Sequence, residues 1–128
     1  MGGGVDVERI GQIAVTVADV ERAREFYRDV LGLRHLFDAP PRMSFFDCGG
    51  VRLLLGEAER AGGGSHGASI IYLYVPDIGR AHETLTARGV TFEQVPHLVA
   101  DLGDRELWLA FFRDSEANVM ALMTEKPK

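Results

Sequence analysis

The sequence predicts an α+β fold of two tandem βαβββ modules, which form a curved half-barrel sheet with the helices on its convex side. Two observations support this prediction. The segment 10–32 and the segment 69–89 share one order of features: a β-branched run, an Asp, an apolar stripe at helical spacing and a Gly. Three further strand-like runs then follow each predicted helix. One such module cannot close its sheet alone, so two modules side by side should enclose a concave face.

The first predicted helix begins after Asp19, a residue type that caps helix N-termini, and Gly32 is well placed to end it in a left-handed conformation. Gly49-Gly50 predicts a tight hairpin between the last two strands of this module. The strands expected after the helix cover residues 33–37, 42–48 and 51–56.

The second module repeats these features, with Asp77 as the cap and Gly89 as the stop. Its later strands are expected at residues 91–99, 106–113 and 119–124, with a turn at 114–118. The stretch 57–67 is rich in Gly and charged residues, which favours a linker. We therefore expect one domain, 1–128, with modules at about 8–56 and 68–125.

Composition excludes several classes of protein. A net charge of −5 and the lack of a Lys/Arg cluster argue against a nucleic-acid partner. No apolar run approaches the ~20 residues of a membrane span. The single cysteine, Cys48, excludes an intrachain disulfide framework and favours a reducing compartment. Residues 1–4 lack the features of a signal peptide, so we expect a cytoplasmic protein without membrane contact.

Two motifs identify a family. The segment Arg24–Leu33, REFYRDVLGL, resembles the "FYrdvLGL" helix end of the vicinal oxygen chelate superfamily, which includes glyoxalases, bleomycin-resistance proteins and extradiol dioxygenases. The segment Phe111–Asn118 resembles that family's "FxDPdGN" turn, with Ser115 and Ala117 as departures. The resemblance extends over roughly residues 8–125 and implies the fold predicted above.

The resemblance also implies where a metal would be held, because metal-dependent members take one ligand from the first and one from the last strand of each module. Counting from the helix caps and the turns gives four positions, Gln12, Leu53, Ile70 and Ala121. A divalent ion needs several nitrogen or oxygen donors, and Gln12 alone supplies one. A shift of one residue in the last strands brings in no better donor. We therefore expect no metal and no cofactor.

Alternation along the strands predicts what lines the concave face instead. If Gln12 faces inward, the residues behind it are uniformly apolar and pack on the helices. The same count brings Ile70 and Tyr72 inward, together with Leu53 and Ala121. Apolar walls with a few hydrogen-bonding groups suit an organic ligand.

The segment 96–108 carries His97 and the only tryptophan, Trp108. It is either a solvated loop with Trp108 in the core, or a clamp in which His97 hydrogen-bonds a ligand and an aromatic ring stacks on it. Trp108 and Phe111 lie on opposite faces of their strand, so the period alone leaves open which of them faces inward.

These features favour a metal-independent protein that binds a small aromatic or hydrophobic molecule, as the bleomycin-resistance branch does, and the resemblance to that branch implies a role in antibiotic resistance. An enzyme of the glyoxalase, isomerase or lyase kind, or a dioxygenase relative, is the alternative. A structural dimer without a ligand is a third reading. We expect a two-fold homodimer, because proteins that resemble this family usually pair and the predicted sheets have open edges.

Overall fold

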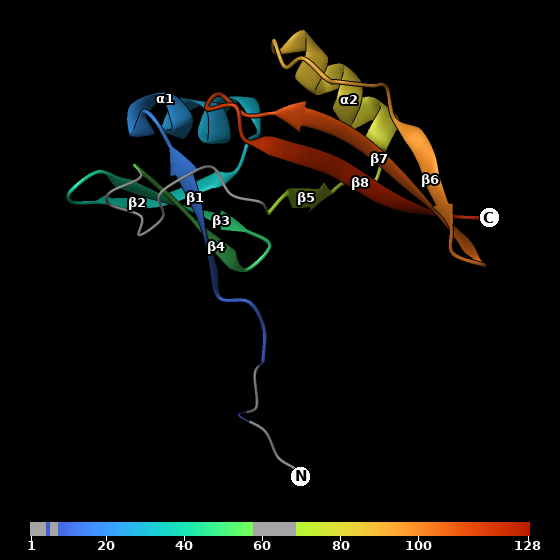
Figure 1. Cartoon of the computed structure of the whole chain (residues 1–128), viewed down its shortest axis with the longest axis horizontal. Coiled ribbons are helices and arrows are strands. Elements are labelled where there is room, and N and C mark those ends of the chain that lie inside the picture. The colour runs from blue at the N-terminus through green and yellow to red at the C-terminus, as the bar shows by residue number, and fades with distance from the viewer. Residues whose placement is uncertain (1–4, 6–7, 58–68) are drawn as a thin grey trace.

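The computed structural model describes residue 5 and residues 8–57 and 69–128. They form two four-stranded sheets side by side, with the helices on one side of both (Figure 1). The α+β fold of tandem βαβββ modules is confirmed. Most of the expected linker lies outside the described residues. None of the helices in the described ranges is long and apolar enough to cross a membrane.

The first sheet is built by the N-terminal module, and its strand order is β1-β4-β3-β2. β1 pairs with β4 in parallel, while the other pairs are antiparallel. Its elements are β1 (Gln12–Val17), α1 (Val20–Glu25), the π-helical turn η1 (Phe26–Val30), β2 (Arg34–Ala39), β3 (Met43–Cys48) and β4 (Val51–Glu57).

The second sheet repeats this topology, with the order β5-β8-β7-β6 and a parallel β5–β8 pair. Its elements are β5 (Ile71–Tyr74), α2 (Ile78–Ala87), β6 (His97–Asp101), β7 (Arg105–Arg113) and β8 (Val119–Pro127). The strand expected at 91–99 is wrong, because β6 begins at His97. Phe92 forms an isolated bridge to Phe112, and Pro96 has no N–H for a ladder.

The helix boundaries follow the predicted signals. Asp19 Oδ1 accepts hydrogen bonds from the N–H groups of Glu21 and Arg22 at 3.0 and 3.2 Å. Asp77 Oδ1 accepts one from Arg80 N–H at 3.0 Å. Gly32 and Gly89, which follow the helices, have φ values of 77° and 94°, the left-handed region that favours glycine.

The helices cover one face of each sheet, and the core lies between. It is one continuous cluster that runs through both modules, from Tyr27 and Phe46 to Phe112, each 0% exposed. The other face of each sheet is left without a helix, and this concave face is where a ligand was expected.

Candidate functional site

Strand register arranges the side chains of the first sheet in rows across its concave face. One row is polar throughout, and its members are Gln12, Arg52, Asp47 and Arg34. The next row is apolar and aromatic, and its members are Ala14, Leu54, Phe45 and Phe37. The Phe37 and Phe45 rings stack at a centroid distance of 4.4 Å.

Leu53 does not lie on this face. It pairs with Ile13 on the helix-covered side and is 1% exposed within the core, so the prediction that it lines the concave face is wrong. The closing pair of the first hairpin, Cys48–Val51, lies on the helix side, whereas the closing pair of the second, Arg113–Val119, lies on the concave side, so equal counts from the two turns reach opposite faces. Arg52 and Leu54 are the inward-facing residues.

The second sheet carries aromatic side chains on the same side. Tyr72, Ala121 and Phe111 form one row. Because Ala121 is small, the rings of Tyr72 and Phe111 meet across it, edge to face, with centroids 6.1 Å apart. Tyr72 is 45% exposed, whereas Ala121 is fully buried. The next row consists of Tyr74, Met123, Leu109 and His97.

The register also decides between Trp108 and Phe111. Trp108 pairs with Thr124 on the helix side and contacts the core, so the alternative in which Trp108 lines the concave face and stacks on a ligand is wrong. Its ring lies under Lys126 Nζ, 4.1 Å from the centroid. His97 lies on the concave side, and its Nδ1 is 3.0 Å from the carbonyl oxygen of Val95. Ile70 precedes β5 and is 38% exposed.

The residues at the family's ligand positions do not fit a divalent metal. Gln12 Oε1 already accepts a hydrogen bond from Arg52 Nε at 2.7 Å, and a guanidinium cation there repels a metal ion. Leu54, which faces inward where Leu53 was expected to, has no donor atom in its side chain, and neither do Ile70 and Ala121. Within 8–57 and 69–128, no group of three His, Cys, Asp or Glu side chains is arranged to hold a metal.

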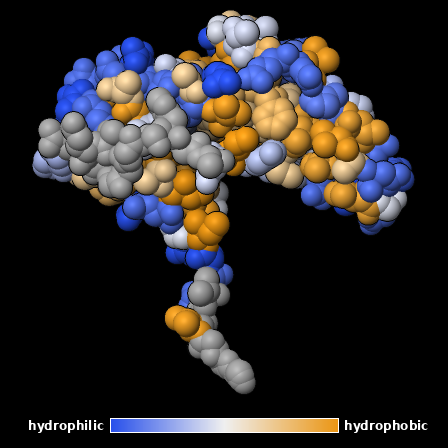
Figure 2. All heavy atoms as spheres, viewed as in Figure 1, coloured by the Kyte–Doolittle hydropathy of each residue, from blue (hydrophilic) through white to orange (hydrophobic). Residues whose placement is uncertain are grey.

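Two cavities are relevant to the site, one on the concave face and one on the helix side of the sheets. A polar one of about 560 Å³ lies at the Gln12 end and is lined by Arg9, Gln12, Asp47 and Arg52 among others. An apolar one of about 550 Å³ lies between the modules, beside α2, with Leu33, Leu73 and Thr84 in its wall. Figure 2 shows hydrophobic surface over the lobe formed by the second sheet, bounded by hydrophilic surface at its tip.

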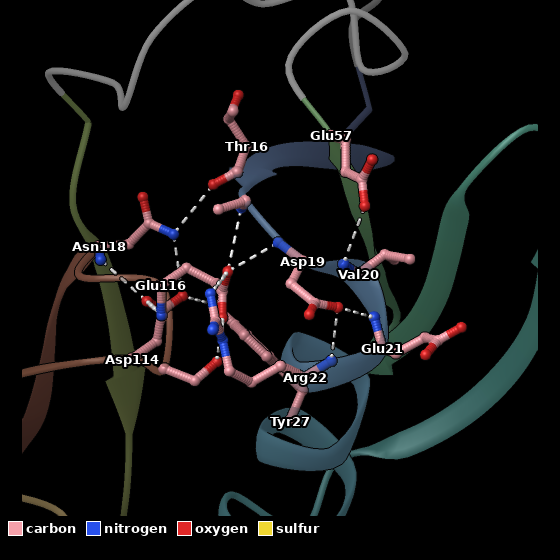
Figure 3. A network of polar contacts seen from close by, with 12 residues as sticks. Thr16, Asp19, Val20, Glu21, Arg22, Tyr27, Glu57, Asp114, Glu116 and Asn118 are labelled. Atoms are coloured by element: carbon pink, nitrogen blue, oxygen red, sulfur yellow. Dashed lines mark hydrogen bonds and ion pairs between the residues drawn. The ribbon is translucent and has the colours of Figure 1, made fainter.

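A buried polar network fixes the two modules against each other (Figure 3). Glu116, in the β7–β8 turn, has a side chain that is 0% exposed. Its Oε1 accepts hydrogen bonds from the N–H groups of Ala18 and Asp19 at 3.0 and 2.9 Å. Arg22 Nε donates to Oε2 at 2.7 Å. Burial alone raises the pKa of this carboxyl, but the bonds from Arg22, Asp19 and Ser115 outweigh it and lower the pKa to about 2.

Asp114 and Asn118 extend the network. The Tyr27 hydroxyl donates to Asp114 Oδ2 at 2.7 Å, and burial together with that carboxylate raises the pKa of Tyr27 well above its usual value. Asn118 Nδ2 donates to the carbonyl oxygen of Thr16 at 3.0 Å. The sequence motif marked this turn but not its role, which is to hold the first strand of one module on the last turn of the other.

A family profile described as the Glyoxalase/Bleomycin resistance protein/Dioxygenase superfamily matches residues 9–115. The chain belongs to this superfamily. An uncharacterized protein of Bacillus subtilis, YraH, is 26% identical over 126 residues, covering 87% of this chain and 94% of YraH.

Three solved structures share the fold, and the first of them is named as a member of the superfamily. A member from Sphaerobacter thermophilus is 26% identical with a TM-score of 0.76, covering 92% of this chain and 98% of its own. Lactoylglutathione lyase from Agrobacterium tumefaciens is 22% identical with a TM-score of 0.78, covering 93% and 95%. TnmS3, an antibiotic binding protein from Streptomyces, is 22% identical with a TM-score of 0.74, covering 98% and 100%.

Proposed function

We propose that this superfamily member is a cytoplasmic, metal-independent protein that binds a planar aromatic or hydrophobic molecule on its concave face. One observation carries the proposal. Where metal-dependent relatives place donor atoms, this chain has Ala121, with the exposed Tyr72 ring and the Phe111 ring on either side. An open aromatic pair without a metal donor suits binding by stacking and burial.

The physical requirements of such binding are modest. Burial of a few hundred Å² of ligand surface at ~25 cal/mol per Å² gives useful affinity even after the entropic costs of association. Stacking on an aromatic ring adds ~0.5–1.5 kcal/mol. A protein of this kind protects a cell by sequestration, and the resemblance to the antibiotic binding protein TnmS3 supports that role.

A lyase or isomerase of the glyoxalase kind is the second candidate. It is favoured by the similarity to lactoylglutathione lyase and by His97, a titratable group on the concave side. An enzyme of this kind would have to work without the metal donors, with His97 or Tyr72 as its acid or base. Conversion of a bound compound, abolished in His97→Ala, would favour it over simple binding.

Metal content separates metal-dependent chemistry from the proposal. We expect the purified protein to contain no stoichiometric divalent ion, because Leu54, Ile70 and Ala121 offer no donors and Arg52 is bonded to Gln12. Added Ni²⁺, Zn²⁺ or Mn²⁺ should leave the melting temperature unchanged, since native-state binding would raise it. One tightly held equivalent, removed only by a chelator, would refute metal independence.

We also propose a two-fold homodimer. Exposed apolar side chains gather on the open face and edges of the second sheet, among them Tyr72, Tyr74 and Leu98. A second copy facing the sheets would bury these side chains and enclose the ligand. Sedimentation equilibrium at micromolar concentration should give twice the 14.1 kDa chain mass. A monomer under those conditions would rule the dimer out.

A thermal-shift screen of planar aromatic compounds tests the function itself. A ligand at 100 times its Kd stabilises the native state by ~2.7 kcal/mol, which is a rise of several degrees in Tm for a domain of this size. Quenching of Trp108 fluorescence is a weaker assay, because that ring lies on the helix side. If a broad aromatic library leaves Tm unchanged, the binding function fails.

A further inference from the structure

Arg52 occupies an unusual place on the concave face. Its guanidinium carbon lies 5.3 Å from the centroid of the Phe45 ring and 5.9 Å from that of Phe37. Its Nε donates to Gln12 Oε1 at 2.7 Å. These contacts fix the plane of the guanidinium, while its two terminal nitrogens form no hydrogen bond or ion pair with any residue that the structure describes. Arg52 therefore presents two oriented N–H donors to whatever enters the concave face.

The charge around Arg52 is positive in a chain whose net charge is −5. Arg34 lies in the same row, and Arg9 lines the same polar cavity of about 560 Å³. Asp47 is the opposing carboxylate in that row and cavity, and within the described ranges it forms no ion pair with either neighbour in its row. Three guanidinium groups against one carboxylate make this end of the face attractive to an anion.

We propose that the ligand of the concave face is a planar aromatic carboxylate, with Arg52 as the residue that selects the acid. This inference rests on the proposed binding function and names its ligand class. A carboxylate matches the fork of a guanidinium in a bidentate pair, which a single ammonium cannot reproduce. Next to Arg52, the Phe37 ring, which is 44% exposed and stacks on the buried Phe45 ring, supplies an apolar surface for the ligand's ring system.

The order of the rows accounts for the shape of this ligand. The polar row lies beside the aromatic row on the same sheet, so a molecule with a charged end and a flat apolar body meets both at once. A doubly charged phosphate without a ring would use the arginines but leave the aromatic row uncovered. A neutral ring would leave the terminal nitrogens of Arg52 without a partner from the ligand.

Three probes that share one ring system test the inference: 2-naphthoate, 2-naphthamide and 2-naphthylmethylamine. Isothermal titration of the full chain should show the acid binding at least tenfold more tightly than the amide, and the ammonium most weakly. Arg52→Gln should weaken the binding of the acid at least tenfold and the binding of the amide by less than twofold. The affinity of Arg52→Lys for the acid should lie between those of the wild type and Arg52→Gln, since lysine keeps the positive charge but cannot form the bidentate pair. Asp47→Asn should strengthen the binding of 2-naphthoate, because it removes the opposing negative charge.

Arg80→Gln is the matched control, because Arg80 is an exposed arginine on α2, on the other side of the sheets. It should leave all three affinities unchanged. Equal binding of acid and amide, or equal weakening of both by Arg52→Gln, overturns the carboxylate inference and leaves the binding function standing. Failure of all three probes and of a broad set of neutral aromatics overturns both.

Discussion

Replacing Glu116 with alanine should lower the free energy of unfolding by about 2–4 kcal/mol. The side chain is fully buried, and it satisfies the N–H groups of Ala18 and Asp19 as well as Arg22. Its removal leaves those two backbone donors without a partner at the contact between the modules. Urea denaturation followed by circular dichroism measures the change, and the Tm should fall by roughly 10 °C.

Glu93→Ala is the control for this experiment. Glu93 pairs with Arg113 at 3.3 Å, but both side chains are about half exposed, at 50% and 55%. An exposed pair of this kind contributes ~0–1 kcal/mol. Equal effects of the two substitutions would contradict a structural role for the buried network.

The stabilising contribution of the Glu116 carboxylate should decrease at low pH. Because the folded state lowers the pKa of Glu116 to about 2, the group stabilises the fold above its unfolded pKa of 4.5. This contribution is lost as the pH falls toward 2. The difference in unfolding free energy between wild type and Glu116→Ala should therefore be constant at neutral pH and shrink below about pH 4.5. A difference that grows on acidification would contradict the lowered pKa.

Phe111→Ala should weaken binding of a planar aromatic ligand by about tenfold or more. The substitution removes a ring that lies in one row with Tyr72 and Ala121, and with it both the stacking term of ~0.5–1.5 kcal/mol and the buried apolar area. Titration calorimetry with the best compound from the thermal-shift screen measures the loss. Tyr72→Ala should act in the same direction.

Two controls locate the ligand. Trp108→Phe changes an aromatic residue on the other side of the same strand and should leave affinity unchanged. Thr84→Trp introduces a large side chain at the apolar cavity beside α2, and it should also have no effect. Loss of binding in Thr84→Trp with full binding in Phe111→Ala would place the ligand in that cavity and contradict the concave-face account.

Local signals in the sequence were sufficient for most of the fold. Asp19 and Asp77 cap their helices because their carboxylates reach free N–H groups of the first turn. Gly49 and Gly50 form the expected hairpin with φ values of 61° and 92°, which a two-residue turn requires and glycine adopts without strain. These features depend on a few neighbouring residues, so spacing alone reveals them.

The face on which a strand residue lies depends on pairing with a distant strand, which the sequence does not state. Leu53 illustrates this, because its hairpin closes with a pair on the helix side, whereas the hairpin at 114–118 closes with a pair on the concave side, so Leu53 lies in the core and not on the expected concave face. Arg52, its neighbour, became the inward residue and proved to be bonded to Gln12. The alternation of side chains along β7 likewise puts Trp108 and Phe111 on opposite faces, but it does not say which of them faces inward. The pairing of β7 with β8, and of β8 with β5, shows that Phe111 lies on the same face as Tyr72.

The intermodule network could not be predicted from the sequence either, because it also depends on contacts between distant residues. Glu116 looks like an ordinary turn residue, and acidic residues in turns are usually solvated. Its partners, the N–H groups of Ala18 and Asp19, lie nearly a hundred positions away along the chain. Only the packing of one module on the other brings them together.

The central claim is that the concave face binds an aromatic molecule without a metal. Titration calorimetry on chelator-treated protein, with a planar aromatic identified by thermal shift, tests it most directly. We predict saturable binding whose Kd is unchanged when Ni²⁺ or Zn²⁺ is added back. Binding that appears only after a metal is restored, or no binding by the metal-free protein, would contradict the account.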